Sequence, residues 1–255
     1  MPEVAARRFS ASGVEFAYVD EGEGEPVVLV HGFASSKEVN WVNPGWIATL
    51  TRAGRRAIAF DNRGHGGSTK LYDSALYHSE IMADDIRALL DHLGIGRADV
   101  MGYSMGARNA AFLAVNHGDR VRSVVLGGLG IHLVEGAGLP TSIAEALEAP
   151  SLDDVTDPQG RMFRAFADQT RSDRRALAAC IRGSRQVLPR AEAALIAVPV
   201  LIAVGTRDVI AGSARDLAAV IPGSRAFDIP DRDHMLSVGD RAYKAAVLEF
   251  LGERP

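Results

Sequence analysis

Apolar and polar residues alternate near the N-terminus, and further along the chain short continuous apolar runs take over. Residues 7–11 and 14–20 alternate on either side of Ser12-Gly13, which predicts a β-hairpin. The later apolar runs are typical of strands that are buried on both faces of a sheet. These runs span residues 27–30, 56–60, 98–101, 121–126, 198–204 and 224–229.

Segments with apolar residues three and four positions apart lie between these predicted strands. In residues 79–93 the apolar side chains recur at the spacing of one helix face, and Gly94 follows as a stop signal. Similar patterns predict helices over residues 46–52, 105–115, 212–220 and 240–251. Strands that alternate with helices predict an α/β fold, with a mostly parallel central sheet and helices on both of its faces. The hairpin adds an antiparallel edge.

Residues from about 131 to 190 interrupt this alternation. They contain no strand-like run, and their periodicity predicts helices over residues 141–148, 161–168 and 173–181. We therefore expect one core domain made of residues 1–130 and 186–255. A small helical cap, residues 131–185, is then inserted between two strands of that core.

The composition is that of an ordinary globular protein, with 47% apolar and 24% charged residues. The formal net charge is −4, so no basic field marks nucleic acid as a partner. Cys180 is the only cysteine and cannot form an internal disulfide. The N-terminus lacks the apolar core of a signal peptide, and the longest apolar stretch, residues 194–205, is too short to span a bilayer. These features predict a cytoplasmic protein without a membrane partner.

The string Gly102-Tyr103-Ser104-Met105-Gly106 lies between a predicted strand and a predicted helix. In that setting the G-x-S-x-G pattern predicts a sharp turn that exposes a serine hydroxyl above the sheet. Glycines at 102 and 106 remove the side chains that would clash across such a turn. Ser104 is therefore the candidate nucleophile.

A serine hydroxyl needs a general base, and the base needs an orienting acid. His234 lies in a polar loop after the last predicted strand, at the sheet edge where ligands of parallel sheets bind. Asp208 directly follows the strand at 198–204 and reaches the same edge. Glu135 is the rival acid, although it comes late after its strand. Asp231 and Asp233 are interpreted as turn residues.

The order Ser104, Asp208, His234 and four motifs resemble the α/β-hydrolase fold superfamily over nearly the whole chain. The motifs are HGF at 31–33, DNRGHGGS at 61–68, GYSMG at 102–106, and GTRD and DRDHM between 205 and 235. The resemblance implies that the backbone N–H groups of Phe33 and Met105 form an oxyanion hole. It also implies that DNRGHGGS is mainly a structural turn, with neither Arg63 nor His65 catalytic.

Arg108 carries a second, narrower resemblance. The string GYSMGAR is close to GYSMGGR of the menaquinone-pathway synthases of this fold, with Ala107 in place of a glycine. In those enzymes this arginine is associated with binding a substrate carboxylate, so the resemblance implies a substrate-binding role for Arg108. A structural arginine is the alternative. Residues 151–190 carry eight Arg and five Asp, a positive excess that is also expected of a solvated helical surface.

Taken together, these features predict a serine hydrolase that cleaves a small carboxylic ester or lactone through an acyl-enzyme, without metal or organic cofactor. Three reactions would use the same triad: C–C bond hydrolysis, cofactor-free perhydrolysis of the haloperoxidase kind, and a menaquinone-pathway-type synthase reaction. A non-catalytic protein that binds a small molecule is a further alternative. The short cap predicts a preference for short acyl chains.

Overall fold

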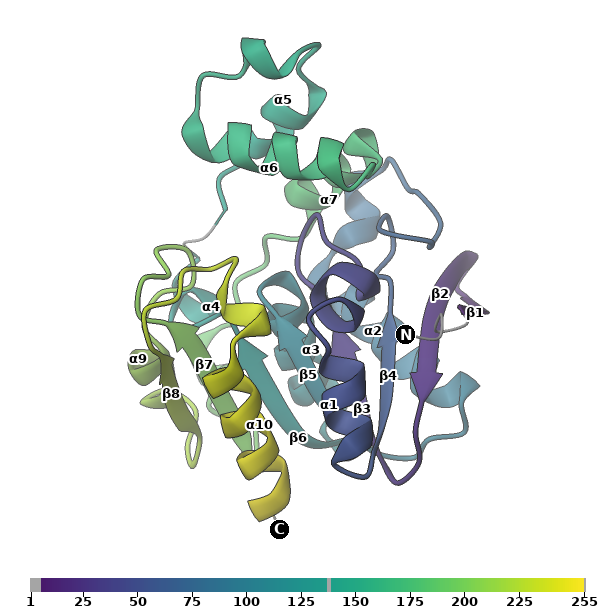
Figure 1. Ribbon diagram of the computed structural model, residues 1–255, viewed down its shortest axis with the longest axis vertical. Coiled ribbons are helices and arrows are strands. Elements are labelled where there is room, and N and C mark those ends of the chain that lie inside the picture. Colours follow the sequence, from purple (N-terminus) through teal and green to yellow (C-terminus); the bar gives the residue numbers. More distant parts are fainter. Residues whose placement is uncertain (1–5, 137–138, 255) are drawn as a thin grey trace.

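Eight strands form one sheet in the order β1-β2-β4-β3-β5-β6-β7-β8 (Figure 1). The computed structural model describes residues 6–136 and 139–254. Strand β2 is antiparallel to both of its neighbours, β1 and β4, and the remaining neighbouring pairs are parallel. The strands are β1 (Arg7–Ala11), β2 (Val14–Glu21), β3 (Glu25–Val30), β4 (Arg55–Phe60), β5 (Ala98–Tyr103), β6 (Val121–Gly127), β7 (Val200–Gly205) and β8 (Arg225–Ile229).

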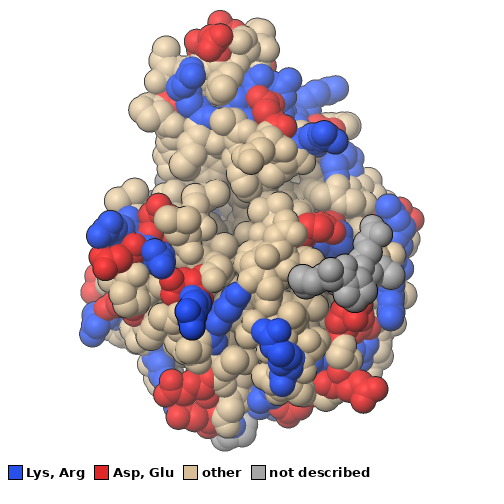
Figure 2. Space-filling model, in the orientation of Figure 1, with Lys and Arg blue, Asp and Glu red and all other residues tan. Residues whose placement is uncertain are grey.

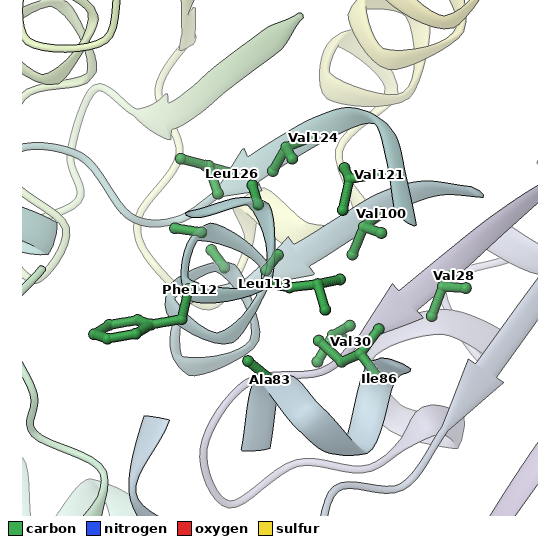
Figure 3. Close-up of a cluster of buried hydrophobic side chains, with 14 of the residues drawn as sticks. Val28, Val30, Ala83, Ile86, Val100, Phe112, Leu113, Val121, Val124 and Leu126 are labelled. Atoms are coloured by element: carbon green, nitrogen blue, oxygen red, sulfur yellow. The ribbon is translucent and has the colours of Figure 1, made fainter. Parts of the chain in front are cut away.

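Helices cover both faces of this sheet, as the alternation along the sequence predicts. In β3, Val28 and Val30 pack toward one group of helices while Val27 and Leu29 pack toward another, so the strand is apolar throughout. Figure 3 shows the first of these two layers, where Val28 and Val30 lie close to side chains of α2 and α3. The core helices are α1 (Trp46–Arg52), α2 (Ser79–His92), α3 (Met105–Asn116), α9 (Ala214–Ala218) and α10 (Arg241–Glu253).

Only helical elements occur in the described residues between β6 and β7, and three of them, α5, α6 and α7, stand above one edge of the sheet (Figure 1). They share a third hydrophobic cluster with Phe33 and Met105, so this helical segment packs on the loops that follow β3 and β5. The elements are α4 (His132–Glu135), α5 (Ser142–Glu148), α6 (Pro158–Gln169), α7 (Arg174–Gly183) and α8 (Arg190–Ala193). We refer to α5–α7 as the cap helices.

The predicted elements differ from the observed ones mainly at their ends. The predicted helix at 212–220 is shorter in the structure, because the Ser213 side chain accepts a hydrogen bond from the Asp216 N–H and so begins α9 at Ala214. The single-turn helices α4 and α8 were not predicted, since four residues carry too little periodicity. All parallel strands end at the same edge, which places the loops after β3, β4, β5, β7 and β8 together beneath the cap helices.

Candidate active site

Ser104 lies in the sharp turn between β5 and α3. Its φ of 54° and ψ of −112° lie in a region that side-chain-bearing residues rarely adopt. A Cβ at Gly106 would stand 2.0 Å from the carbonyl oxygen of Val30, and one at Gly102 would stand 2.2 Å from the carbonyl oxygen of Gly106. Glycine at both positions is therefore what allows the turn to be so tight, as the sequence pattern predicts. The Ser104 N–H donates to the Gly127 carbonyl oxygen at 2.7 Å and ties the turn to β6.

The structure brings Ser104, His234 and Asp208 together from three different loops. His234 Nε2 lies 3.0 Å from Ser104 Oγ, and His234 Nδ1 lies 2.7 Å from Asp208 Oδ2. The Asp208 side chain is fully buried and the His234 side chain is 9% exposed. A carboxylate only accepts, so Nδ1 carries the imidazole proton and Nε2 is free to accept one from the serine hydroxyl.

Asp208 and His234 are each held by further hydrogen bonds. The second carboxylate oxygen of Asp208 accepts from the N–H groups of Ile210 and Ala211, at 2.8 and 3.0 Å. The Tyr103 hydroxyl donates to the His234 carbonyl oxygen at 2.5 Å. Burial raises the pKa of Tyr103, so the phenol keeps the proton that it donates. Asp208 and His234 are therefore both fixed in place by hydrogen bonds as well as by the loops that carry them.

The rival carboxylates lie elsewhere. Glu135 belongs to α4 and forms a surface ion pair with Arg190 at 2.7 Å. Asp231 pairs with Arg207 at 2.9 Å, also at the surface. Asp233 accepts hydrogen bonds from the backbone N–H groups of Met235 and Leu236, at 3.0 and 2.8 Å. None of the three is hydrogen-bonded to the imidazole of His234.

Two backbone N–H groups beside Ser104 are free to bind an anionic oxygen. Met105 is the first residue of α3, where helix N–H groups have no partner within the helix. Neither the Met105 N–H nor the Phe33 N–H donates to any acceptor in residues 6–136 and 139–254. Phe33 and Met105 both line the same hollow as Ser104. The partial positive charge at the N-terminus of α3 favours negative charge at this point.

Ser104 lines two hollows. The first, which we call the basic hollow, contains Arg108 and Arg185 and also Ser184 and Ile181 from the cap region. The second, which we call the apolar hollow, contains His234. Its apolar walls are formed by Val39, Leu139, Phe163, Phe166, Leu236 and Val238. Figure 2 shows a recess of uncharged residues between the cap helices and the sheet, with charged side chains mostly outside it.

Arg108 lies on α3 one turn beyond Ser104. Its guanidinium donates to the carbonyl oxygens of Gln186, Leu133 and His132, at 2.6, 3.3 and 3.3 Å. Burial and the neighbouring charge of Arg185 lower the pKa of Arg108 to about 10. These contacts join α3 to both ends of the segment between β6 and β7, which is what the structural alternative predicts. Arg108 also lines the basic hollow, and no carboxylate of the described residues forms an ion pair with it.

Sequence reasoning missed the side chains that shape the apolar hollow. Leu139, Phe163 and Phe166 belong to the segment above the sheet, and nothing in their local pattern shows that they face Ser104. It also missed Asn40, whose amide oxygen accepts from the Gly32 N–H at 2.8 Å. These residues reach the site only through the packing of distant segments.

Comparison with known proteins assigns the chain to a family. The α/β hydrolase fold family matches residues 25–176. The chain belongs to this family. No group of three or more metal-ligating side chains suited to an ion occurs in the part of this α/β hydrolase that the structure describes. Nor does any helix of that part combine the length and the apolar character needed to cross a membrane.

Curated relatives of this α/β hydrolase carry several different activities in their names. It is 38% identical over 115 residues to the non-heme chloroperoxidase CPO-A1 of Kitasatospora aureofaciens, covering 45% of this chain and 40% of that protein. It is 34% identical over 148 residues to the 2-hydroxymuconate semialdehyde hydrolase of Pseudomonas sp. strain CF600, covering 58% of this chain and 49% of that protein. The matches thus span less than half the length of each relative.

Solved structures share the fold over nearly the whole chain. The enol-lactonase from Burkholderia xenovorans LB400 superposes with a TM-score of 0.78 and 24% identity, covering 97% of this chain and 100% of that one. At this identity the likeness shows the fold alone.

Proposed function

We propose that this α/β hydrolase is a serine hydrolase that cleaves a small carboxylic ester or lactone. The observation that supports the proposal most is the unbroken pair of hydrogen bonds that runs from Asp208 through His234 to Ser104, at 2.7 and 3.0 Å. This is the arrangement in which an imidazole can deprotonate a serine hydroxyl while a buried carboxylate stabilises the resulting imidazolium.

In the proposed reaction Ser104 Oγ attacks the carbonyl carbon and its proton passes to His234 Nε2. The Phe33 and Met105 N–H groups donate to the oxygen that becomes negatively charged. His234 then gives its proton to the leaving oxygen as the C–O bond breaks, which leaves an acyl group on Ser104. A water molecule, deprotonated by His234, releases the acid and restores the serine. The proposed steps use no metal or organic cofactor.

The two hollows suggest which half of the substrate lies on which side of Ser104. The leaving oxygen must come within hydrogen-bond reach of His234, and His234 lines the apolar hollow but not the basic one. We therefore assign the leaving alcohol to the apolar hollow and the acyl group to the basic hollow. A lactone, which carries both halves in one ring, would lie across Ser104.

We further propose that the acyl group carries a carboxylate, bound by Arg108 as the sequence comparison implies. Arg108 and Arg185 both line the basic hollow, and no ion pair joins either of them to an acid of the described residues. Arg108 donates to backbone carbonyls through its two Nη atoms, so its Nε–H remains available to a ligand. Two neighbouring guanidinium groups, one of them partly buried, would be stabilised by an anion.

The proposal that the acyl group of the substrate carries a carboxylate is tested with matched nitrophenyl esters. A hydrogen succinate monoester should have a kcat/KM about 10-fold above that of the neutral butyrate ester at low salt, and less at high salt. Arg185→Gln should reduce this ratio. The control is Arg182→Gln: Arg182 lies outside the hollow and pairs with Glu148, so its replacement should leave the ratio unchanged. Equal kcat/KM values for the two esters in the wild-type protein would refute the carboxylate and leave the esterase proposal standing.

The reaction class is tested by one panel of substrates. Short-chain nitrophenyl esters and simple lactones should be hydrolysed by the wild-type protein and not by Ser104→Ala. A 1,5-diketone ring-fission product tests C–C bond hydrolysis, and peracid formation from acetate and hydrogen peroxide tests perhydrolysis. The ester proposal is wrong if either of these substrates is turned over with a higher kcat/KM than every ester and lactone of the panel.

A further inference from the structure

The loop that carries Phe33 is held by side chains from two other segments. The Gly32 N–H donates to Asn40 Oδ1 at 2.8 Å, and the Ala34 N–H donates to His65 Nε2 at 3.2 Å. Phe33 lies between them, and its own N–H has no acceptor in the described part of the chain. Of three consecutive N–H groups, the two outer ones are thus bound by side chains and the middle one is left free.

His65 can serve only as an acceptor toward this loop. Its Nδ1 lies 2.9 Å from the carbonyl oxygen of Arg63, which cannot donate, so Nδ1 carries the proton and Nε2 does not. Burial, together with the neighbouring His31, lowers the pKa of His65 to about 3, so the imidazole remains neutral. The glycine-rich turn after β4 therefore presents a fixed hydrogen-bond acceptor to the Ala34 N–H.

The backbone at Ala34 requires such support. Its φ of 58° lies in the left-handed region, which is unfavourable for a residue with a side chain. Ala34 is fully buried, and both His65 and Asn40 are less than a tenth exposed. A strained, buried turn of this kind persists only when its surroundings fix it. Asn40 and His65 supply that constraint from either side of Phe33.

We propose that His65 and Asn40 are positioning residues for the oxyanion hole. By binding the N–H groups of Gly32 and Ala34, they hold the Phe33 N–H toward the carbonyl oxygen that gains negative charge during attack by Ser104. This inference rests on the proposed function. His65 lines neither hollow, so it acts through the loop alone, whereas Asn40 also lines the apolar hollow. His65 therefore provides the cleaner test.

The test compares two replacements of His65. His65→Phe keeps an aromatic ring against Phe33 but removes the acceptor, and His65→Gln keeps an acceptor of similar reach. We expect His65→Phe to lower kcat for a nitrophenyl ester by about 10- to 100-fold with little change in KM, because a misplaced donor weakens only the transition state. His65→Gln should remain within about 3-fold of the wild type.

A control and a second readout separate positioning from general damage. Ser68→Ala disturbs the same turn, where Ser68 accepts from the Ala17 N–H, without touching Ala34, and should leave kcat nearly unchanged. The second readout is the kcat ratio between an oxygen ester and its thionoester, since sulfur is a poorer hydrogen-bond acceptor. A working oxyanion hole favours the oxygen ester, and His65→Phe should reduce that preference.

The outcomes distinguish this inference from the proposed function. A folded His65→Phe protein with wild-type kcat and a wild-type oxygen-to-sulfur ratio overturns the positioning role, even if Ser104→Ala is inactive. A wild-type protein that hydrolyses no ester overturns the proposed function instead. If His65→Phe does not fold, Asn40→Leu decides the matter in the same assays. Its control is Ser36→Ala, which alters the neighbouring turn at the Val39 N–H and leaves Gly32 untouched.

Discussion

The loops at the sheet edge and the cap helices above them hold their charged groups in different surroundings. At the sheet edge, Lys37 pairs with Asp61 at 2.8 Å and Arg63 of the turn after β4 pairs with Asp85 of α2 at 2.7 Å, and all four side chains are at most 5% exposed. Removing one partner of such a buried pair leaves an uncompensated charge, which costs several kcal/mol. Replacing any one of these four residues is therefore expected to destabilise the loops around Ser104 strongly.

Of the ion pairs between described residues of the cap helices, two have both partners at the surface, whereas Arg164 of α6 is 5% exposed and pairs with Asp168, which is 44% exposed. Arg182 pairs with Glu148 and Arg174 with Asp168, with each of these side chains about 40% exposed. Exposed pairs of this kind contribute about 0–1 kcal/mol each and are weakened by salt. What the cap contributes to the site is apolar surface, such as Phe166. The comparison suggests that the reaction depends on the loops of the sheet, whereas the choice of substrate depends on the cap.

The largest expected loss comes from removing the base. His234→Ala should lower kcat by at least about 10⁴-fold, because no other group can take the Ser104 proton, while the sheet and its loops remain folded. Steady-state ester hydrolysis, with circular dichroism as a check on folding, measures this. Residual activity within 100-fold of the wild type would mean that another group acts as the base.

Removing the orienting acid should cost somewhat less. Asp208→Asn should lower kcat by about 10³- to 10⁴-fold, because the imidazole loses both its fixed tautomer and the charge that stabilises its protonated form. The matched control is Glu135→Gln, which changes the rival carboxylate in its surface pair with Arg190 and should leave kcat unchanged. The reverse result would move the acid to the loop after β6.

The buried imidazole of His65 makes the stability of the core depend on pH. Its pKa is about 3 when folded, against 6.5 for an ordinary histidine, so the unfolded chain binds one more proton between these pH values. Its contribution to stability therefore falls as the pH drops below about 6.5. His65 is surrounded by His31, Lys70 and Asp61, whose charges do not reverse the direction of the shift.

This dependence can be isolated with His65→Gln, which cannot take up that proton. The difference in unfolding free energy between pH 7 and pH 5 should be smaller in the variant than in the wild type by about 2 kcal/mol. Urea titrations at the two pH values measure it. An identical pH dependence in the two proteins would show that His65 is not held neutral in the folded state.

The smallest effect is expected from the cap. Phe166→Ala removes apolar surface from the hollow assigned to the leaving group, so kcat/KM for a bulky aromatic ester should fall by about 5- to 20-fold, and for a methyl ester hardly at all. Gln169→Ala, an exposed change on the same helix, serves as the control. An equal loss for both esters would mean that the cap affects the chemistry as well as the selection of substrate.

The difference between the loops at the sheet edge and the cap helices also explains what could be predicted from the sequence. Ser104, Asp208 and His234 follow directly from strand ends and a local glycine pattern, because parallel strands bring their carboxyl ends to one edge. The cap helices were predicted as helices, but which of their faces covers Ser104 depends on packing between distant segments. Asn40 and His65 could not be predicted for the same reason, since each contacts the loop that carries Phe33 from a different turn.

The proposed nucleophile is tested most directly by locating a covalent adduct. The protein is treated with a fluorophosphonate probe, digested, and the modified residue is identified by mass spectrometry. We expect a single adduct on Ser104 in the wild-type protein, none in Ser104→Ala, and strongly slowed labelling in His234→Ala. Labelling at another serine, or equal labelling of Ser104→Ala, would contradict the assignment of Ser104 as the nucleophile.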